Sequence, residues 1–414
     1  MKRALDTDGG IRIMSDAEHV EKRSSMYLGS SIAEERVSLC ATIEMVTPKA
    51  AATADTDETA AAETDSAKKS KPVPVVTIEE RLATMVPAML KIFDEVITNA
   101  LDAAIKGQGV RTIKVSVDDV SFGVWNDGEG MPCTDHSEAR IPVPQLAFGT
   151  YKTGSNYDDE GERSVAGMNG FGAKLTNTFS SEFTVKVKHA ATGDTYEQTW
   201  RNGMKEVGPA RVKFGAKKSK TGECDSPGAD DGAGASGADK KRSNKGYVSV
   251  TAKPVALLGQ ITADTKAIML ARTVEIAVAA PKETRVLFND MLVTCTTVQK
   301  LMHLIYPAAA FIAVDDANPH WTVACAHVDG ARTRLHGIVN GASASAGMHM
   351  AHAQSKVMKP LLETLKSKRE TKGVGITAKS WDANCAWFVA ARVNQPTFDS
   401  QTKVQCVLFP HLFY

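Results

Sequence analysis

The chain has 414 residues, of which 43% are hydrophobic and 23% charged, an ordinary globular composition with room for two domains or more. Lys and Arg number 49 against 48 Asp and Glu, so the net charge of +1 gives no global field, and nucleic-acid contact would need local basic patches. Seven cysteines without a C-x-x-C pair favour reduced thiols, and the lack of an 18-residue apolar run or an apolar leader argues against a membrane or secreted protein.

The first part of the chain predicts an arm, a short helix and an insertion. Residues 1–10 are expected to be a flexible arm. Ser15, followed three residues later by Glu18, predicts a capped helix within residues 11–27 that ends at Gly29. Residues 48–74 are rich in Ala, Thr, Asp and Lys and predict a disordered insertion.

A longer helix is predicted over residues 87–102, PAMLKIFDEVITNALD. Pro87 suits the first helical position. At about 100° per residue, Glu95, Asn99 and Asp102 share one face, opposite an apolar face. A carboxylate can take a proton from water, and an amide oxygen is a suitable Mg²⁺ ligand. Taken alone, the pattern also fits a core helix with a solvated polar face.

Two strands and a glycine turn follow this helix. Residues 112–117 alternate as a strand, and the apolar run VSFGVW ends in Asn126-Asp127-Gly128-Glu129-Gly130. Closely spaced glycines after a strand let the backbone approach a ligand, although the same pattern also fits a plain turn. Residues 147–159 are polar and predict a loop or lid.

The string G-M-N-G-F-G-A-K over residues 167–174 predicts an anion site. Backbone N–H groups and a positive helix end meet a phosphate in such loops. The string is not a P-loop, because no Ser or Thr follows a Gly-Lys pair, and no G-x-G-x-x-G supports a dinucleotide fold. A glycine-rich segment can also be a plain turn that binds no ligand.

The remaining pattern predicts an α+β protein with a second domain. Strands are expected at residues 183–188, 194–200, 246–251 and 285–288, a helix at 264–280 and an insertion at 217–245. The second domain is expected to contain strands at 321–327, 334–339 and 386–393 and a helix at 348–365. The basic run KSKRETK, residues 366–372, fits either a solvated turn or phosphate contact with nucleic acid.

Four signals stand in one order: E-x-x-x-N on a helix, N-D-G-E-G after a strand, a glycine-rich loop, and QTK within NQPTFDSQTK. Together with KIFDEVITNALD, SNYDDE and GMNGFGAKLTNTFSSEFTV, they resemble the ATPase region of a eukaryotic or viral type II DNA topoisomerase. The resemblance implies a GHKL (Bergerat) α/β sandwich over residues 11–300. A transducer domain of the ribosomal-S5-like βαβ type would follow over residues 301–414.

The same resemblance implies roles for individual residues. Glu95 matches the general base, Asn99 the Mg²⁺ ligand and Lys403 the transducer cation that reaches the γ-phosphate. Lys366, Lys368, Arg369 and Lys372 match a DNA-contacting loop. The ATP-binding residues would be Asn99, Asn126, Gly128, Gly130, Ser155, Asn156, Gly167, Met168, Asn169, Gly170, Phe171, Gly172, Ala173, Lys174, Gln401, Thr402 and Lys403.

The implied function is ATP-driven closure of a homodimer around double-stranded DNA, in the nucleus or in a viral factory in the cytoplasm. Three departures from the family pattern affect it. Arg12 replaces a strap Tyr, residues 23–29 lack the usual Pro, and Met168 replaces a common lid Arg. Because nothing after QTK resembles a DNA-cleavage domain, the transducer is expected to be truncated. An incomplete gene product, a piece of a longer protein and one subunit of a split enzyme, whose partner carries the cleavage domain, all fit this expectation. Another GHKL ATPase and a non-catalytic relic are alternative interpretations.

Overall fold

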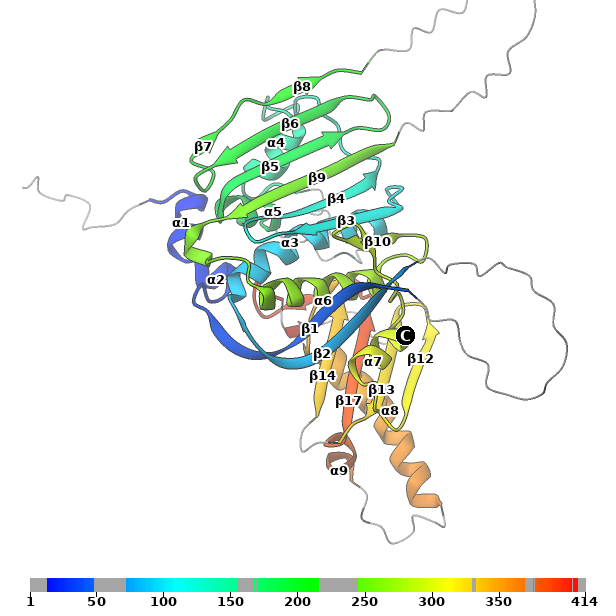
Figure 1. Cartoon of the computed structure of the whole chain (residues 1–414). Helices are drawn as coiled ribbons and strands as arrows, with labels where there is room; N and C mark the ends of the chain where they lie inside the picture. Colours follow the sequence, from blue (N-terminus) through cyan, green and yellow to red (C-terminus); the bar gives the residue numbers. More distant parts are fainter. Residues whose placement is uncertain are drawn as a thin grey trace, which may run out of the picture.

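The computed structural model describes residues 13–47, 72–154, 165, 167, 170–215, 245–329, 333–368, 375, 377–403 and 405–408. The arm at residues 1–10, Arg12 and nearly all of both predicted insertions therefore lie outside the described residues. Within the described part, the helices α3 (Pro87–Ile105) and α6 (Ala263–Ala279) lie between a large sheet and the sheet of a second domain (Figure 1).

The large sheet has nine strands in the order β11-β10-β3-β4-β9-β5-β6-β7, with β8 also paired to β6. Only β10 and β3 pair in parallel; the other pairs are antiparallel. The strands are β3 (Thr112–Val117), β4 (Phe122–Gly128), β5 (Ser180–Lys188), β6 (Thr195–Arg201), β7 (Glu206–Val207), β8 (Arg211–Lys213), β9 (Gly246–Pro254), β10 (Arg285–Phe288) and β11 (Met291–Leu292).

Helices cover one face of this sheet and leave the other open (Figure 1). The central helix α3 begins at Pro87 and is buried on nearly every side, with Phe93, Ile97 and Leu101 at most 1% exposed. The helices of the first domain are α1 (Asp16–Lys22), α2 (Ser24–Leu28), α3 (Pro87–Ile105), α4 (Val143–Gly149), α5 (Gly172–Thr178), α6 (Ala263–Ala279) and α7 (Val298–Ile305), with a 3₁₀ turn, η1 (Ala256–Leu258).

The predicted cap of α1 is confirmed, because the Glu18 N–H donates to the Ser15 hydroxyl while the Glu18 carboxylate accepts from the Ser15 N–H. Two expectations were wrong. Residues 147–149 belong to α4 rather than to a loop. Pro144 lies in the first turn of this helix, where its missing N–H costs no hydrogen bond. Val73 and Pro74 are strand residues rather than part of an insertion.

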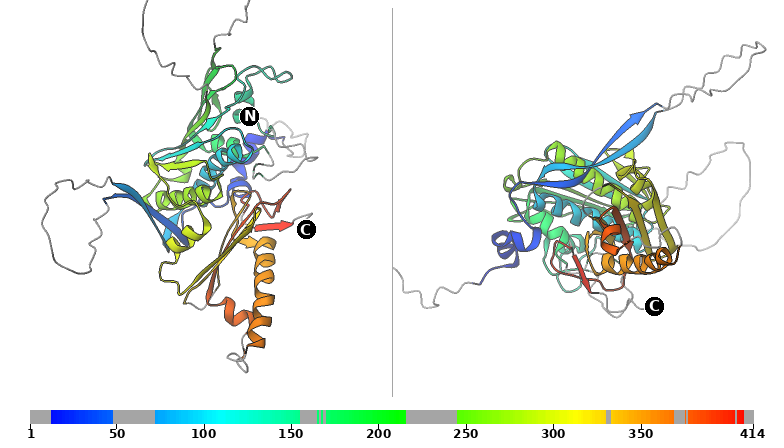
Figure 2. Two further views of the ribbon diagram at one scale, coloured as in Figure 1. Left: turned by 90° about the vertical axis from the view of Figure 1, so that its right-hand side faces the viewer. Right: turned by 90° about the horizontal axis from the view of Figure 1, so that it is seen from below.

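A long hairpin that the sequence pattern did not predict precedes α3. Strands β1 (Glu34–Val46) and β2 (Val73–Met85) pair antiparallel along their whole length. Figure 2 shows the hairpin crossing the helices and projecting beyond the body of the protein. Its inner face packs on the core through Ala41, Val76 and Ile78, so this hairpin covers α6.

The second domain has a five-stranded sheet, in the order β12-β13-β17-β14-β15, and a three-stranded sheet, in the order β16-β19-β18. Its core is continuous with that of the first domain, and the boundary predicted near residue 300 falls inside α7. The elements are β12 (Ile312–Asn318), β13 (Trp321–His327), β14 (Arg334–Val339), β15 (Ala342–Ser343), β16 (Ala346–Gly347), α8 (Met348–Ser367), α9 (Ala378–Asp382), β17 (Cys385–Ala391), β18 (Thr397–Phe398) and β19 (Gln405–Leu408).

Candidate active site

A cavity of about 740 Å³ opens between α3, β4, α5 and the segment that follows β18. This volume is within the range of small-molecule and cofactor sites. The structure brings together at this cavity most of the described residues that the motifs singled out: Glu95, Asn99, Asp102, Asn126, Gly130, Gly167, Gly170, Phe171, Gly172, Ala173, Lys174, Gln401 and Lys403.

Other predicted residues are not placed at the cavity. Gly128 and Thr402 do not line it, and the Thr402 methyl group lies near Gly29 instead. Six further predicted residues lie outside the described part of the chain: Ser155, Asn156, Met168, Asn169, Arg369 and Lys372. Lys366 and Lys368 lie at the end of α8, away from the cavity lining.

Glu95 is held by two lysines. Its side chain is 6% exposed, and Oε1 lies 2.7 Å from Lys91 Nζ and 3.9 Å from Lys403 Nζ. Burial raises the pKa of the Glu95 carboxyl, but the cations of Lys403 and Lys91 outweigh burial, and the pKa falls below its usual value. Glu95 is therefore an ionised carboxylate at neutral pH, and the solvated polar face considered for α3 is ruled out for Glu95.

Lys403 reaches Glu95 from the second domain. It has a left-handed backbone, with φ of +61°, and its N–H donates to the Ser400 carbonyl at 3.1 Å. A lysine in this region of backbone space costs about 1 kcal/mol, so the surrounding turn must fix it there. Gln401 lines the same cavity. The two domains thus contribute to one site.

The glycine-rich loop meets α3 at the same place. Gly172 begins α5, and a Cβ at this position would collide with Oε2 of Glu95. On the other side of the loop, the Gly167 N–H donates to the Asp102 carboxylate at 2.9 Å. Only glycine therefore allows the start of α5 to lie against the Glu95 carboxylate.

Lys174 is a buried cation with no carboxylate partner among the described residues. Its side chain donates to the Thr153 carbonyl at 2.6 Å, and the residue is only 5% exposed. Burial lowers the pKa of the Lys174 amine from 10.5 to about 8. An anion entering the cavity would supply the missing countercharge.

A column of aromatic rings holds the loop that precedes α5. Phe171 stacks on Tyr27, with ring centroids 5.8 Å apart, and contacts Tyr151 at 5.3 Å. Tyr27 Oη is 3.0 Å from His19 Nδ1, so α1 and α2 are connected to the loop. Tyr151 in turn bonds to Thr178 at the end of α5. The N-terminal helices thereby support the glycine-rich loop.

The other end of the cavity lies at β4. Asn126 is buried, and its Nδ2 donates to the Asp127 carbonyl at 2.9 Å beside the apolar side chain of Val124. Gly128 and Gly130 have φ of +129° and +69°, and a Cβ on either would collide with the protein's own backbone. These glycines therefore have a packing role in the protein itself.

Sequence reasoning missed Lys91, the closest partner of Glu95. Its signal was present, because a lysine four residues before a glutamate on a helix lies beside it. Burial pulls the pKa of Lys91 down, but the carboxylates of Glu95 and Asp94 outweigh burial and raise it. Lys91 therefore remains charged inside the protein.

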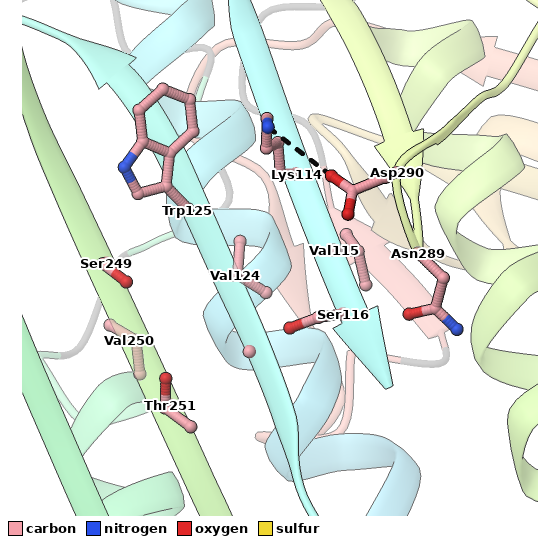
Figure 3. A pocket seen from close by; sticks show the side chains of 11 residues that line it. Lys114, Val115, Ser116, Val124, Trp125, Ser249, Val250, Thr251, Asn289 and Asp290 are labelled. Atoms are coloured by element: carbon pink, nitrogen blue, oxygen red, sulfur yellow. Dashed lines mark ion pairs between the residues drawn. The ribbon is translucent and has the colours of Figure 1, made fainter. Parts of the chain in front are cut away.

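A second hollow, of about 340 Å³, lies on the open face of the large sheet (Figure 3). Trp125, Ser249 and Thr251 line it, and Lys114 pairs there with Asp290 at 3.5 Å. Lys114 also lies over the Trp125 ring. Its charges are paired and it is shallow, whereas the first cavity combines a glycine loop with the buried cation of Lys174.

Comparison with known proteins gives matches to ATPases and to type II topoisomerases. Residues 86–207 match the family model described as histidine kinase-, DNA gyrase B-, and HSP90-like ATPase. DNA topoisomerase 2 of Drosophila melanogaster is 31% identical over 339 residues, and mouse DNA topoisomerase 2-beta is 28% identical over 347 residues. These alignments cover 78% and 80% of this chain but 21% and 20% of the relatives, so the chain spans about a fifth of their length.

Solved structures show the same architecture. The ATPase region of Saccharomyces cerevisiae topoisomerase II superposes with a TM-score of 0.75 at 24% identity, covering 96% of this chain and 90% of that one. The ATPase and transducer domains of topoisomerase II from Balamuthia mandrillaris superpose equally well, with a TM-score of 0.75 at 23% identity over 97% and 89% of the two chains. The predicted GHKL fold with a transducer is confirmed, as is the resemblance to the topoisomerase II ATPase region.

Proposed function

We propose that this chain binds and hydrolyses ATP as the ATPase module of a type II DNA topoisomerase. The observation that carries the proposal is the meeting of Glu95 and Lys403 at 3.9 Å, from two domains, in the wall of a cavity that Lys174 also lines. A carboxylate that can orient water and cations that can neutralise phosphate charge are the parts that phosphoryl transfer to water requires.

The triphosphate lies along the start of α5, where Lys174 and the loop backbone contact its oxygens. Lys403 moves from Glu95 to the γ-phosphate when nucleotide enters, because phosphate offers more negative charge. Glu95 then accepts a hydrogen bond from the attacking water and takes its proton. Lys91 keeps the carboxylate ionised and in place, since its Nζ lies 2.7 Å from Oε1 on the same helix in the empty protein.

Asn99 is the residue that would hold Mg²⁺. It is exposed to the cavity one helical turn after Glu95, and its amide oxygen is a hard ligand. Among the described residues, no group of three or more His, Cys, Asp or Glu side chains could hold a metal ion. This fits Mg²⁺ that arrives with the nucleotide, because such Mg²⁺ uses one or two protein ligands and the phosphates. The ion would neutralise charge on the phosphates.

The link between domains gives ATP a mechanical role. While the γ-phosphate is bound, Lys403 ties the second domain to the nucleotide, and phosphate release breaks that contact. We propose that this cycle closes a homodimer around double-stranded DNA in the nucleus, or in a viral factory in the cytoplasm. Lys366 and Lys368 would contact DNA phosphates, and strand cleavage would reside in sequence or a subunit beyond this chain. In the described part, no helix is long and apolar enough to cross a membrane.

The test compares wild type with Glu95→Gln. The variant should bind a non-hydrolysable ATP analogue within about threefold of wild type and lose at least about 100-fold in turnover, the usual contribution of a general base. Glu182→Gln, on the sheet, is the control and should leave both unchanged. Undiminished hydrolysis by Glu95→Gln would refute the role of Glu95. Wild type that binds the analogue but hydrolyses no ATP, with or without DNA, would favour the non-catalytic alternative.

A further inference from the structure

A tight turn of the second domain is inserted against the catalytic helix. Asn340 and Gly341 connect β14 to β15 with φ of +51° and +85°, the signature of a two-residue hairpin turn. Asn340 is 1% exposed, and its side-chain amide both donates to the Val393 carbonyl and accepts from the Val393 N–H, each at 2.8 Å. The turn is therefore a rigid part of the second domain.

The tip of this turn touches the first domain at two points. A Cβ on Gly341 would collide with the Leu101 side chain of α3, so the backbone lies directly against the catalytic helix. The Gly341 carbonyl accepts a hydrogen bond from Nη2 of Arg272 on α6. The contact is separate from the one that Lys403 makes, and it involves a part of the second domain that does not line the nucleotide cavity.

Arg272 uses its whole guanidinium group. Its side chain is 10% exposed; Nε donates to Asp94 Oδ1 at 2.7 Å, and Nη1 donates to Glu275 Oε2 at 2.9 Å. Together with the bond to the Gly341 carbonyl, the planar guanidinium group therefore donates to three acceptors that lie in three directions. A lysine could not reproduce this, because it presents one point charge.

The contact chain ends at the general base. Asp94 precedes Glu95, and Lys91 lies between them, 3.5 Å from Asp94 Oδ2 and 2.7 Å from Glu95 Oε1. Burial raises the pKa of the Asp94 carboxyl, but Arg272 and Lys91 lower it to about 2. Asp94 thus stays charged and fixed between two cations.

We propose that Arg272 is a positioning residue. When the Asn340–Gly341 turn docks against it, Arg272 holds Asp94 in place and, through Asp94 and Lys91, the carboxylate of Glu95. The inference rests on the proposed ATPase function and deepens it. Docking of the second domain thus affects Glu95 by two routes. One is the direct contact of Lys403, and the other is this chain of ionic contacts. Hydrolysis then requires the two domains to be correctly seated.

Arg392 is a matched control for a residue that only holds the two domains together. Arg392 also spans the two domains, since its Nη2 donates to the Ala279 carbonyl at the end of α6, at 3.1 Å. It joins the same helix to the same domain through the same kind of bond. It has no described contact with α3, so its loss should weaken the interface without moving Glu95.

The experiment measures turnover and analogue binding for three single variants, Arg272→Lys, Asp94→Ala and Arg392→Lys. We expect Arg272→Lys and Asp94→Ala to lose about tenfold or more in kcat, because small misplacements of catalytic groups have effects of this size. Their affinity for a non-hydrolysable ATP analogue should stay within about threefold. Arg392→Lys should keep kcat within about twofold. A thermal melt confirms that each variant is folded at the assay temperature.

The double variant Asp94→Ala/Arg272→Lys shows whether Arg272 acts on kcat through Asp94 or independently of it. If Arg272 acts through Asp94, the double variant loses no more than about twofold beyond the worse single variant, whereas independent defects multiply. Multiplied losses, or equal kcat for Arg272→Lys and Arg392→Lys, would overturn the inference. Should Arg272→Lys melt too early, Asp94→Ala alone tests the link, because Arg272 keeps Glu275. Wild type without turnover would instead refute the proposed function.

Discussion

Two lysines that are almost equally buried should respond in opposite ways to replacement by methionine. Lys174 is 5% exposed and has no described carboxylate partner, whereas Lys91 is 6% exposed and lies between two carboxylates. We predict that Lys174→Met stabilises the nucleotide-free protein at pH 7 and that Lys91→Met destabilises it. The reason is that only the first substitution removes a buried charge that has no countercharge among the described residues.

The expected change in the free energy of unfolding follows from the shift in the pKa of Lys174. The fall of the Lys174 pKa from 10.5 to about 8 means that burying its charge costs about 3 kcal/mol, at about 1.4 kcal/mol for each tenfold change. Loss of the hydrogen bond to the Thr153 carbonyl offsets about 1 kcal/mol of this, so Lys174→Met should gain about 2 kcal/mol. Lys91→Met should lose about 3 to 5 kcal/mol, since it leaves Asp94 and Glu95 partly uncompensated.

The sign of the pH dependence gives a second check. Between pH 8 and 10.5 the unfolded chain holds a proton on Lys174 that the folded protein has released. Unfolding therefore binds protons in this window, and wild-type stability from this group rises with pH. The advantage of Lys174→Met should be fully present below pH 8 and should disappear as the pH approaches 10.5.

The assay is chemical denaturation of the empty protein at pH 7 and pH 10, with analogue binding measured at pH 7. Lys174→Met should unfold at higher denaturant concentration at pH 7 yet bind the ATP analogue at least about tenfold more weakly, because a buried charge–phosphate contact is worth more than 1.4 kcal/mol. Destabilisation of Lys174→Met as large as that of Lys91→Met would refute the idea of an uncompensated cation waiting for phosphate.

Three further predictions concern the loop, its support and the basic end of α8. Gly172→Ala should lower ATP turnover about tenfold or more by displacing the Glu95 carboxylate, the proposed general base, whereas Gly375→Ala, which meets nothing within 4 Å, should not change it in the same assay. Tyr27→Ala should weaken analogue binding about 2- to 10-fold in a titration, because an aromatic pair contributes about 0.5–1.5 kcal/mol; Tyr27→Phe, which keeps the stack, should bind like wild type. Replacing Lys366 and Lys368 together by Ala should reduce the salt dependence of duplex DNA binding by about two charges; an unchanged slope would exclude contact there.

Much of the first domain could be predicted from local signals. The start of α3 at Pro87, the cap of α1 at Ser15 and the strand at 112–117 follow from rules that involve neighbouring residues only. The helix predicted at 264–280 is α6, Ala263–Ala279, because Thr262 caps it and its apolar positions recur with helical spacing.

The hairpin of β1 and β2 could not be predicted in the same way. Its strands are separated by a long polar insertion, and many of their side chains, such as Val46 and Val73, are exposed. No short turn fixes the register, so the pairing depends on packing against α6 rather than on local sequence. The helix α4 was missed for a related reason, since its prolines suggest a loop until the helix start is known.

The candidate site was predicted as a set of motifs rather than as a geometry. Helical spacing placed Glu95 and Asn99 on one face, but only the folded chain brings Lys403 to Glu95. The sequence pattern also gave no reason to connect Arg272 with Asp94, because that contact depends on how α6 crosses α3. Lys403 could be identified from the QTK motif, but Arg272 lies in no motif, so nothing in the single sequence pointed to its long-range contact.

The buried charges fall into two kinds, and the difference explains how the site can be both rigid and reactive. Lys91, Asp94 and Arg272 neutralise one another, so their positions are fixed by the high cost of leaving any of them unpaired. Lys174 has no such partner among the described residues, and its charge is maintained at a cost in stability. A triphosphate would remove that cost on binding. Nucleotide binding can therefore be favourable at the glycine-rich loop. The ionic network of Lys91, Asp94 and Arg272, which positions the Glu95 carboxylate, needs no rearrangement for this.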